Sequence, residues 1–240
     1  MSSRQVVVTS FSPEGARIYG WKMVKSFRRF WDVPLVIYTD TPASFPCGAV
    51  RLTSDIQDWS ALRASWQHDP SVHGCPDPAY PDREKHYAFV WDAARFAVKA
   101  FVICDAAERL KRGVLTWLDG DTVTTQEVDP QFTVNLLGDA DVAYLGRRHL
   151  YPETGYLGLR LPEALPLVRW CRDAYVTGSF RALTDGWTDC HVFQEALRQV
   201  PVRARNLTAH VDTTDSHIWA YSPLADYLDH RKGRQRKAHE

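Results

Sequence analysis

The sequence lacks the features that mark several special classes of protein. No apolar run approaches the ~18 residues of a membrane span. The N-terminus has no apolar core of a secretory signal, so we expect a cytoplasmic protein. Acidic and basic residues balance at 29 each, so the overall charge favours neither nucleic acid nor an anionic membrane as partner. We find no internal repeat and no low-complexity segment.

Cysteine is too scarce and scattered to suggest a disulfide framework or a zinc site. No Cys-X-X-Cys pair occurs among Cys47, Cys75, Cys104, Cys171 and Cys190. Reduced thiols of a cytosolic protein are the simplest interpretation. A hydrophobic fraction of 45% and nine tryptophans predict a globular protein, and the 240 residues predict one domain over 1–240 with a large core.

Apolar segments of two kinds alternate along the chain, and they predict an α/β fold. Continuous apolar runs predict buried strands at 5–11, 34–40, 113–118, 141–145 and 155–161. Helical spacing of apolar residues predicts helices at 13–31, 87–104, 162–177 and 189–199. Continuous apolar strands that alternate with helices are typical of a largely parallel sheet covered on both faces.

Two segments are weakly patterned. Prolines interrupt residues 41–84, where we expect only a short helix at about 59–66; this segment is either an irregular functional insertion, such as a lid, or a plain loop. From 206 onwards the chain is loop-like except for a short helix predicted at 223–229. It ends in the very basic run 230–237, which is either a solvated terminus or a clamp for an anionic ligand.

The clearest candidate site is Asp119-Gly120-Asp121, which directly follows the apolar strand at 113–118. Strand side chains alternate with period two, so acids separated by one residue point to the same side, and Gly120 keeps the bend sterically open. Carboxylate oxygens suit Mn²⁺ or Mg²⁺, which can in turn hold a diphosphate. Asp-Gly is also a common turn dipeptide, so a solvated turn is the alternative interpretation.

The order of these features resembles that of a known family. A strand ends in Thr9-Ser10, another ends in Asp40, a helix carries Arg95 and Lys99, and a later strand runs into LDGDT. This order resembles the GT-A fold of nucleotide-sugar glycosyltransferases. The blocks FVWDAARFAVKAF and VLTWLDGDTVTT are similar to those of the glycogenin and bacterial galactosyltransferase type. The ending SPLADYLDHRKGRQRK resembles small glycosyltransferase-like proteins of bacteriophages and bacteria.

The resemblance implies a fold, a donor and a metal. The fold would be a GT-A-like, Rossmann-type mixed sheet flanked by helices. The activity would be transfer of a sugar, with retention of configuration, from a nucleotide-sugar (UDP-sugar favoured) in a bacterial or phage-infected host cytosol. Mn²⁺ (or Mg²⁺) would be bound by Asp119, Asp121 and His230, and two carboxylates with one imidazole are compatible with Mn²⁺.

The resemblance also assigns a role to the C-terminal segment 222–240, which would close over the diphosphate. The family has His-X-X-Gly-X-X-Lys in this place, and here His230 and Gly233 match it. Arg236 takes the place of the lysine, with Lys237 beside it and Lys232 nearby. A diphosphate leaving group needs such cationic partners, because they stabilise the charge that it develops.

Residues nearer the N-terminus complete the expected nucleotide site. Thr9, Ser10 and Asp40 follow strand ends, where open α/β sheets bind ligands, and the resemblance places them at the base and ribose. Asp40 would equally serve as the cap of the following turn. Arg95 and Lys99 lie on one helix face; either they face the nucleotide and donor sugar, as the resemblance implies, or they lie on an exposed helix face.

Two further carboxylates are candidate catalytic residues. Asp189 starts a predicted helix and is a natural N-cap, while the resemblance places an aspartate there against the donor sugar. Glu153 is the best extra carboxylate on the acceptor side. An inverting enzyme would need one of these two as its base. We interpret His191, His210 and His217 as surface or structural residues.

The sequence leaves the acceptor open among a protein-linked sugar, a glycan, a lipid-linked sugar and a hydroxymethylated DNA base. The phage-like ending favours the modified base, on which Trp59, Arg63 and Trp66 would stack. The zero net charge argues against it. Two alternatives to a glycosyltransferase are an inactive nucleotide-binding module of the same fold and a nucleotidyltransferase, although the Gly-rich basic loop of the latter is absent after the first strand.

Overall fold

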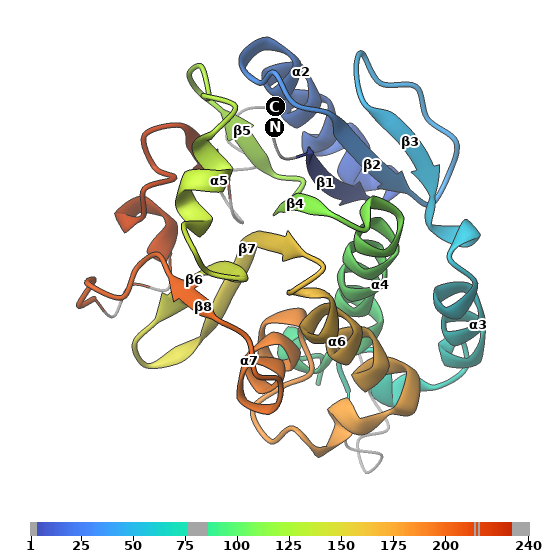
Figure 1. Cartoon of the computed structure of the whole chain (residues 1–240). Helices are drawn as coiled ribbons and strands as arrows, with labels where there is room; N and C mark the ends of the chain where they lie inside the picture. The colour runs from blue at the N-terminus through green and yellow to red at the C-terminus, as the bar shows by residue number, and fades with distance from the viewer. Residues whose placement is uncertain (1–3, 76–85, 214, 216, 232–240) are drawn as a thin grey trace.

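The computed structural model describes residues 4–75, 86–213, 215 and 217–231, and its centre is a seven-stranded sheet (Figure 1). The strand order is β3-β2-β1-β4-β7-β6-β8. Their bounds are β1 (Gln5–Phe11), β2 (Leu35–Thr39), β3 (Ala49–Leu52), β4 (Gly113–Leu118), β6 (Val142–Arg147), β7 (Leu150–Leu161) and β8 (Ala204–Asn206). Strand β7 runs antiparallel to β4 and β6, and the other pairs are parallel. The predicted α/β fold with a mixed, largely parallel sheet is therefore confirmed.

Alternating side chains of the central strands pack into two apolar layers, one on each face of the sheet. Val8 and Leu115 belong to one buried cluster, and their neighbours Val7 and Val114 belong to the other. Successive side chains of a strand point to opposite faces of the sheet, and here both faces are covered by core. This is why β1 and β4 are apolar at nearly every position.

Helices cover both layers. The first cluster lies under α3 (Gln57–Trp66), α4 (Ala93–Leu110), α6 (Leu165–Thr177) and α7 (Asp189–Gln199). The second lies under α2 (Trp21–Phe30), α5 (Phe132–Leu137) and the segment 207–228. Figure 1 shows α4, α6 and α7 gathered together, with α2 and α5 apart from them. Among the described residues, no helix has the length and apolar character needed to cross a bilayer.

The predicted helix at 87–104 is displaced in the structure. Residues Phe89–Trp91 form a 3-10 turn, and α4 starts only at Ala93. The Asp92 carboxylate accepts from the Arg95 N–H at 3.1 Å and so caps the helix. The helix continues to Leu110 and stops where Lys111 takes a φ of 64°. Apolar periodicity alone did not locate this cap.

The segment 41–84 is less irregular than predicted. Within it β3 forms the edge of the sheet beside β2, and α3 packs on the first cluster; residues 76–84 lie outside the described part of the chain. Trp59 and Trp66 are only 5% and 7% exposed. Their rings pack against Phe101 and Phe180 at centroid distances of 5.4 and 5.7 Å. The prediction that they present free rings for an extruded base is therefore wrong, because the core uses them.

The prediction of a helix at 223–229 is also wrong. Residues 223–227 form turns, and β9 (Leu228–His230) pairs antiparallel with β5 (Thr122–Thr124) in a separate two-stranded ribbon. The 3-10 turn at Ile218–Tyr221 precedes it, with Trp219 buried at 2% exposure. The ribbon forms by pairing between segments about a hundred residues apart, which local sequence pattern does not reveal.

Candidate functional site

Asp119, Gly120 and Asp121 form a tight turn between β4 and β5. The N–H of Thr122 donates to the Asp119 carbonyl at 3.0 Å and closes the turn. Gly120 does not have a left-handed φ, but a Cβ at this position would lie 2.6 Å from the Phe11 ring. The two carboxylates converge because of a turn packed against Phe11, and not because of the strand alternation that the sequence suggested.

His230, the third predicted ligand, reaches this turn from the end of the described chain. The register of β5 and β9 places it opposite Thr122, and the N–H of Arg231 donates to the Asp121 carbonyl at 3.1 Å. The Nε2 atom of His230 lies 3.1 Å from Asp121 Oδ1 and 3.7 Å from Asp119 Oδ2. The structure thus brings the three predicted ligands together.

The donor set fits a divalent cation. The three ligand atoms all lie within 4.8 Å of one another. Two donors on one ion at ~2.1 Å are roughly 3–4.2 Å apart, so modest side-chain shifts would bring Asp119, Asp121 and His230 onto one cation. The imidazole is held by packing: its ring centroid lies 4.5 Å from that of Trp219, and a Cβ on Gly155 would lie 2.7 Å from its Cε1. Its Nδ1 has no hydrogen-bond partner among the described residues, in contrast to the usual anchored metal ligand.

A second charged group adjoins the first and is centred on Lys99 of α4. The Lys99 Nζ lies 2.8 Å from Asp119 Oδ1 and 2.6 Å from Asp189 Oδ2. It also donates to the Thr154 carbonyl at 3.0 Å, and the Thr154 hydroxyl donates to Asp189 at 2.5 Å. Trp117 Nε1 donates to Asp119 Oδ1 at 2.8 Å. Lys99 therefore lies inside the site and is not part of an exposed helix face.

The proximity of these groups shifts their proton equilibria. Burial alone would lower the pKa of Lys99, but Asp119 and Asp189 outweigh it and raise that pKa. Burial alone would raise the pKa of Asp119, but Lys99 and His230 outweigh it and hold that pKa well below its usual range. Burial also opposes the charged form of His230, yet its hydrogen bonds to Asp119 and Asp121 raise its pKa to about 9. Because a metal-ligating imidazole must be neutral, binding of a cation at this group would release a proton from His230.

Both groups open into one cavity of about 650 Å³. Ser10, Arg95 and Glu153 of the predicted set also line this cavity, and so does His217, which we had interpreted as surface or structural. Glu153 is buried at 3% exposure, and its Oε1 accepts from the Gly155 N–H at 3.1 Å. The sequence did not single out the further lining residues Tyr19, Phe89, Trp117, Arg147, Tyr151 and Thr154.

The Asp189 carboxylate lies in this cavity because of where α7 begins. The N-cap of that helix is Thr188, so the prediction that Asp189 caps it is wrong. As the first residue of the helix, Asp189 is buried at 8% exposure and directs its carboxylate to Lys99.

Asp40 lies at a second cavity of about 460 Å³. Its carboxylate accepts from the Thr53 hydroxyl at 2.6 Å and lies 3.4 Å from an Arg63 nitrogen, so it does not cap the turn that follows β2. Ser10 and Arg95 line both cavities, and the cavities therefore adjoin.

One described residue of the predicted set, Thr9, is not brought to the site. Thr9 is fully buried within the sheet and lines neither cavity. Its neighbour Ser10 is the residue of β1 that reaches them, because alternate residues of a strand point to opposite faces. Lys232, Gly233, Arg236 and Lys237 lie outside the described residues.

Comparison with known proteins adds no relative. No protein-family model matches this chain, and no curated protein matches it.

Proposed function

We propose that the protein is a metal-dependent glycosyltransferase of the GT-A type. It would move a sugar from a nucleotide-sugar, with UDP-sugar favoured by the sequence resemblance, to an acceptor hydroxyl. One observation carries the proposal: Asp119, Asp121 and His230 converge within 4.8 Å at the carboxyl end of β4, beside a cavity of about 650 Å³. An ordinary solvated turn would not bury Asp121 to 3% exposure or recruit a histidine 109 residues away.

The two adjoining cavities suit an elongated ligand. A nucleoside in the cavity at Asp40 could extend its diphosphate past Ser10 and Arg95 towards the Asp119–His230 group. Ligands bind at this edge of open α/β sheets because the loops after the strands meet there. A bound Mn²⁺ or Mg²⁺ would offset the charge that develops on the diphosphate when the sugar leaves.

The protein's own residues would position the sugar. Lys99 holds Asp189 and Asp119 in fixed orientations, and the second oxygen of Asp189 can accept from a sugar hydroxyl. Glu153 lines the same cavity and is the candidate base if transfer inverts the anomeric centre. Retention is the outcome that the sequence resemblance implies, and it needs no such base.

A thermal-shift matrix tests the proposal. UDP, GDP, CDP, TDP and their sugars are each added with and without Mn²⁺ to wild type and to Asp121→Asn. A ligand at 100 times its dissociation constant stabilises the fold by about 2.7 kcal/mol. We expect one nucleotide to raise the melting temperature only with metal, and Asp121→Asn to abolish that rise.

Asp141→Asn is the matched control. Asp141 is also a buried carboxylate with a cationic partner, but it lies at the opposite end of the sheet. This variant should keep the full ligand-induced shift from a lower starting temperature. If no nucleotide stabilises wild type in any combination, the proposal fails; a nucleotide shift without turnover on any acceptor would leave an inactive nucleotide-binding module.

A further inference from the structure

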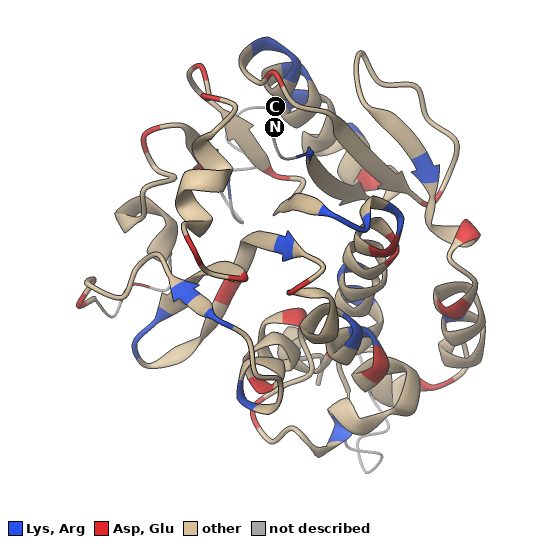
Figure 2. Cartoon of the chain, viewed as in Figure 1, with Lys and Arg blue, Asp and Glu red and all other residues tan. Residues whose placement is uncertain are grey.

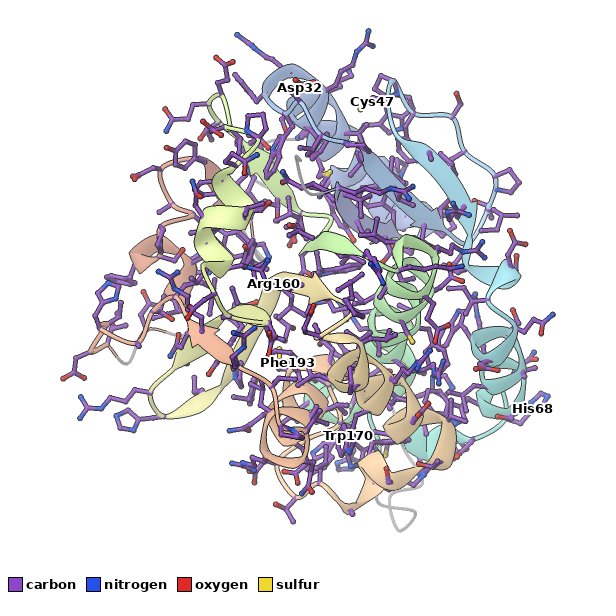
Figure 3. All side chains as sticks on the ribbon, in the orientation of Figure 1. Asp32, Cys47, His68, Arg160, Trp170 and Phe193 are labelled. Carbon is purple, nitrogen blue, oxygen red and sulfur yellow. The ribbon has the colours of Figure 1, made fainter. Side chains whose placement is uncertain are left out.

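The zero net charge of the chain hides a strong local segregation of charge. The helical segment 13–31, built from α1 (Pro13–Gly15), a π-helical turn (Ala16–Gly20) and α2, contains five cations and a single acid, Glu14. The rest of the chain therefore carries a net charge of −4. Figure 2 shows the blue bands along α2, and Figure 3 places Asp32, the next acid, just beyond the end of this helix. We call the five cations the α2 stripe; they are Arg17, Lys22, Lys25, Arg28 and Arg29.

The stripe lies on the outer face of the helix. Met23, Val24 and Phe27 point into the second apolar cluster, whereas all five cations are exposed. Several of them are three or four residues apart, so like charges adjoin on the helix surface and repel one another. This repulsion does not stabilise the helix, and a bound anionic ligand would reduce it.

Within the described chain, the exposed arginines of the stripe have no ion pair, whereas several exposed arginines elsewhere do. Among the described residues, no carboxylate lies within 4.0 Å of the charged atoms of Arg17, Lys25, Arg28 or Arg29. By contrast, ion pairs with nearby acids hold Arg109, Arg169, Arg181, Arg198 and Arg203. Arg17, Lys25, Arg28 and Arg29 thus form an exposed cationic surface without carboxylate partners among the described residues.

One end of the stripe adjoins the candidate site. Tyr19, between Arg17 and Trp21 in sequence, lines the cavity of about 650 Å³. Trp21 is 43% exposed and contacts Phe45 at a ring centroid distance of 5.3 Å. A chain-like anion bound along the stripe would therefore run to the rim of the cavity.

We propose that the α2 stripe binds the phosphate backbone of a nucleic acid, and that the acceptor is a group on that nucleic acid. The stripe covers about 18 Å of helix, which matches the rise of about five nucleotides of one strand. Three of its five cations are arginines, which can bind phosphate in a bidentate manner. An anionic membrane is a poorer partner, because the apolar face of this helix is buried in the core and cannot insert into lipid.

The second half of this proposal rests on the proposed function, whereas the binding itself does not. The sequence argument against a nucleic-acid acceptor was the zero net charge, and the segregated charge removes that argument. Base-modifying enzymes dock the backbone and draw the target nucleotide into a cavity. A stripe that leads to the cavity rim has the arrangement that such docking requires.

Fluorescence anisotropy with a labelled 20-nucleotide DNA, single-stranded and duplex, tests the binding as salt is varied. Each phosphate contact contributes about −0.9 to the slope of log K against log salt for duplex DNA and about −0.7 for single strands. Replacing Arg17, Lys25 and Arg28 together by glutamine should reduce the steepness of the duplex slope by about 2 to 3 and weaken low-salt binding at least tenfold.

The matched control replaces Arg109, Arg169 and Arg198 by glutamine, since it removes the same charge from arginines that are exposed but paired. It should bind DNA like wild type. Equal effects of the two triple variants, absence of salt-dependent DNA binding, or binding to vesicles containing phosphatidylserine in preference to DNA would each overturn the proposal.

The nucleotide thermal shift separates the two proposals. The stripe variant should retain the Mn²⁺-dependent shift, which also shows that it is folded. DNA binding without any nucleotide shift in wild type would support the stripe as a binding surface and contradict the proposed transfer.

Discussion

The two ends of the central sheet hold charged residues in opposite ways. At the end where the parallel strands begin, the Arg203 guanidinium and N–H both donate to Asp141, at 2.6 and 2.9 Å. Arg160, labelled on β7 in Figure 3, donates there to the carbonyls of Ala140 and Gly138. Asp141, Arg160 and Arg203 are thus each satisfied by a neighbouring segment at this end.

At the end where the parallel strands finish, the charges come from four separate segments and surround a cavity. Lys99 stands on α4, Asp119 follows β4, Asp189 begins α7 and His230 ends β9. The difference shows that ion pairs at the first end fasten the fold, whereas those at the second hold side chains around a ligand-sized space. Three predictions test this contrast.

The largest difference in stability between the two ends should appear when the cation of each is removed in turn. Lys99→Met leaves Asp119 and Asp189 without their shared partner in a buried site, which we expect to lower the free energy of unfolding by about 3–5 kcal/mol. Arg203→Met should cost far less, because the Arg203 side chain is 64% exposed and water replaces it. Urea denaturation at pH 7 measures both.

The double variant Lys99→Met/Asp189→Asn is the control for this pair. It removes one of the stranded carboxylates and should recover part of the loss. Equal losses for Lys99→Met and Arg203→Met would show that the two ends do not differ in the way described.

A smaller effect should come from two glycines, Gly113 at the start of β4 and Gly120 in the turn that follows it. Gly113, at the first end, has a φ of 119°, and a Cβ there would overlap the Arg4 carbonyl, so Gly113→Ala should cost about 2–4 kcal/mol. Gly120→Ala meets chiefly the Phe11 ring, with the Ser10 carbonyl oxygen 3.0 Å away, and should cost about 1–3 kcal/mol.

The order of the two variants should be reversed for nucleotide binding, which Gly120→Ala should affect more than Gly113→Ala. Gly120→Ala moves the turn that carries Asp119 and Asp121, so the Mn²⁺-dependent nucleotide shift should weaken, whereas Gly113→Ala should keep it. Phe11→Leu in the Gly120→Ala protein should restore part of the stability. An unchanged nucleotide shift in Gly120→Ala would mean that the packing of this turn does not set the metal geometry.

The smallest effect concerns pH at the first end. Hydrogen bonds from Arg203 hold the pKa of Asp141 below its ordinary value of 3.8. A depressed pKa contributes stability above the unfolded pKa and loses it as pH falls through the folded one. Wild type should therefore be more stable than Asp141→Asn at neutral pH, and the difference should shrink steadily below about pH 3.8. A difference that stays constant down to pH 2 in thermal melts would show that the charge on Asp141 is irrelevant.

Long apolar segments made much of the fold predictable. The strands near 5–11, 35–39 and 113–118 and the helices near 165–177 and 189–199 were confirmed, because each buries a face that must be apolar. Strands β3, β8 and β9 and the short helix α5 were not predicted. They are short, and the strands lie at edges or in the ribbon, where pairing with a distant segment and not their own pattern fixes the conformation.

The residues of the candidate site also fall into those that the sequence indicated and those that only the structure revealed. The paired acids were visible because Asp-Gly-Asp follows an apolar strand, and His230 was expected only through the resemblance to a known family. The contact of Lys99 with both Asp119 and Asp189, and the place of Thr154 between them, were not visible. Ser10, and not Thr9, reaches the cavities, and this choice depends on which face of β1 each residue occupies.

The sequence by itself determined the α/β class, the central strands and the position of the acidic turn, because burial and turn chemistry are local requirements on residue type. Only the tertiary structure decided that His230 and Lys99 meet that turn from opposite parts of the chain. It also decided that Arg17, Lys25, Arg28 and Arg29 lie on the outer face of one helix with no carboxylate of the described residues beside them. The physical reason is the same in each case: charges act over a few ångströms of space, and distance along the chain does not set which of them become neighbours.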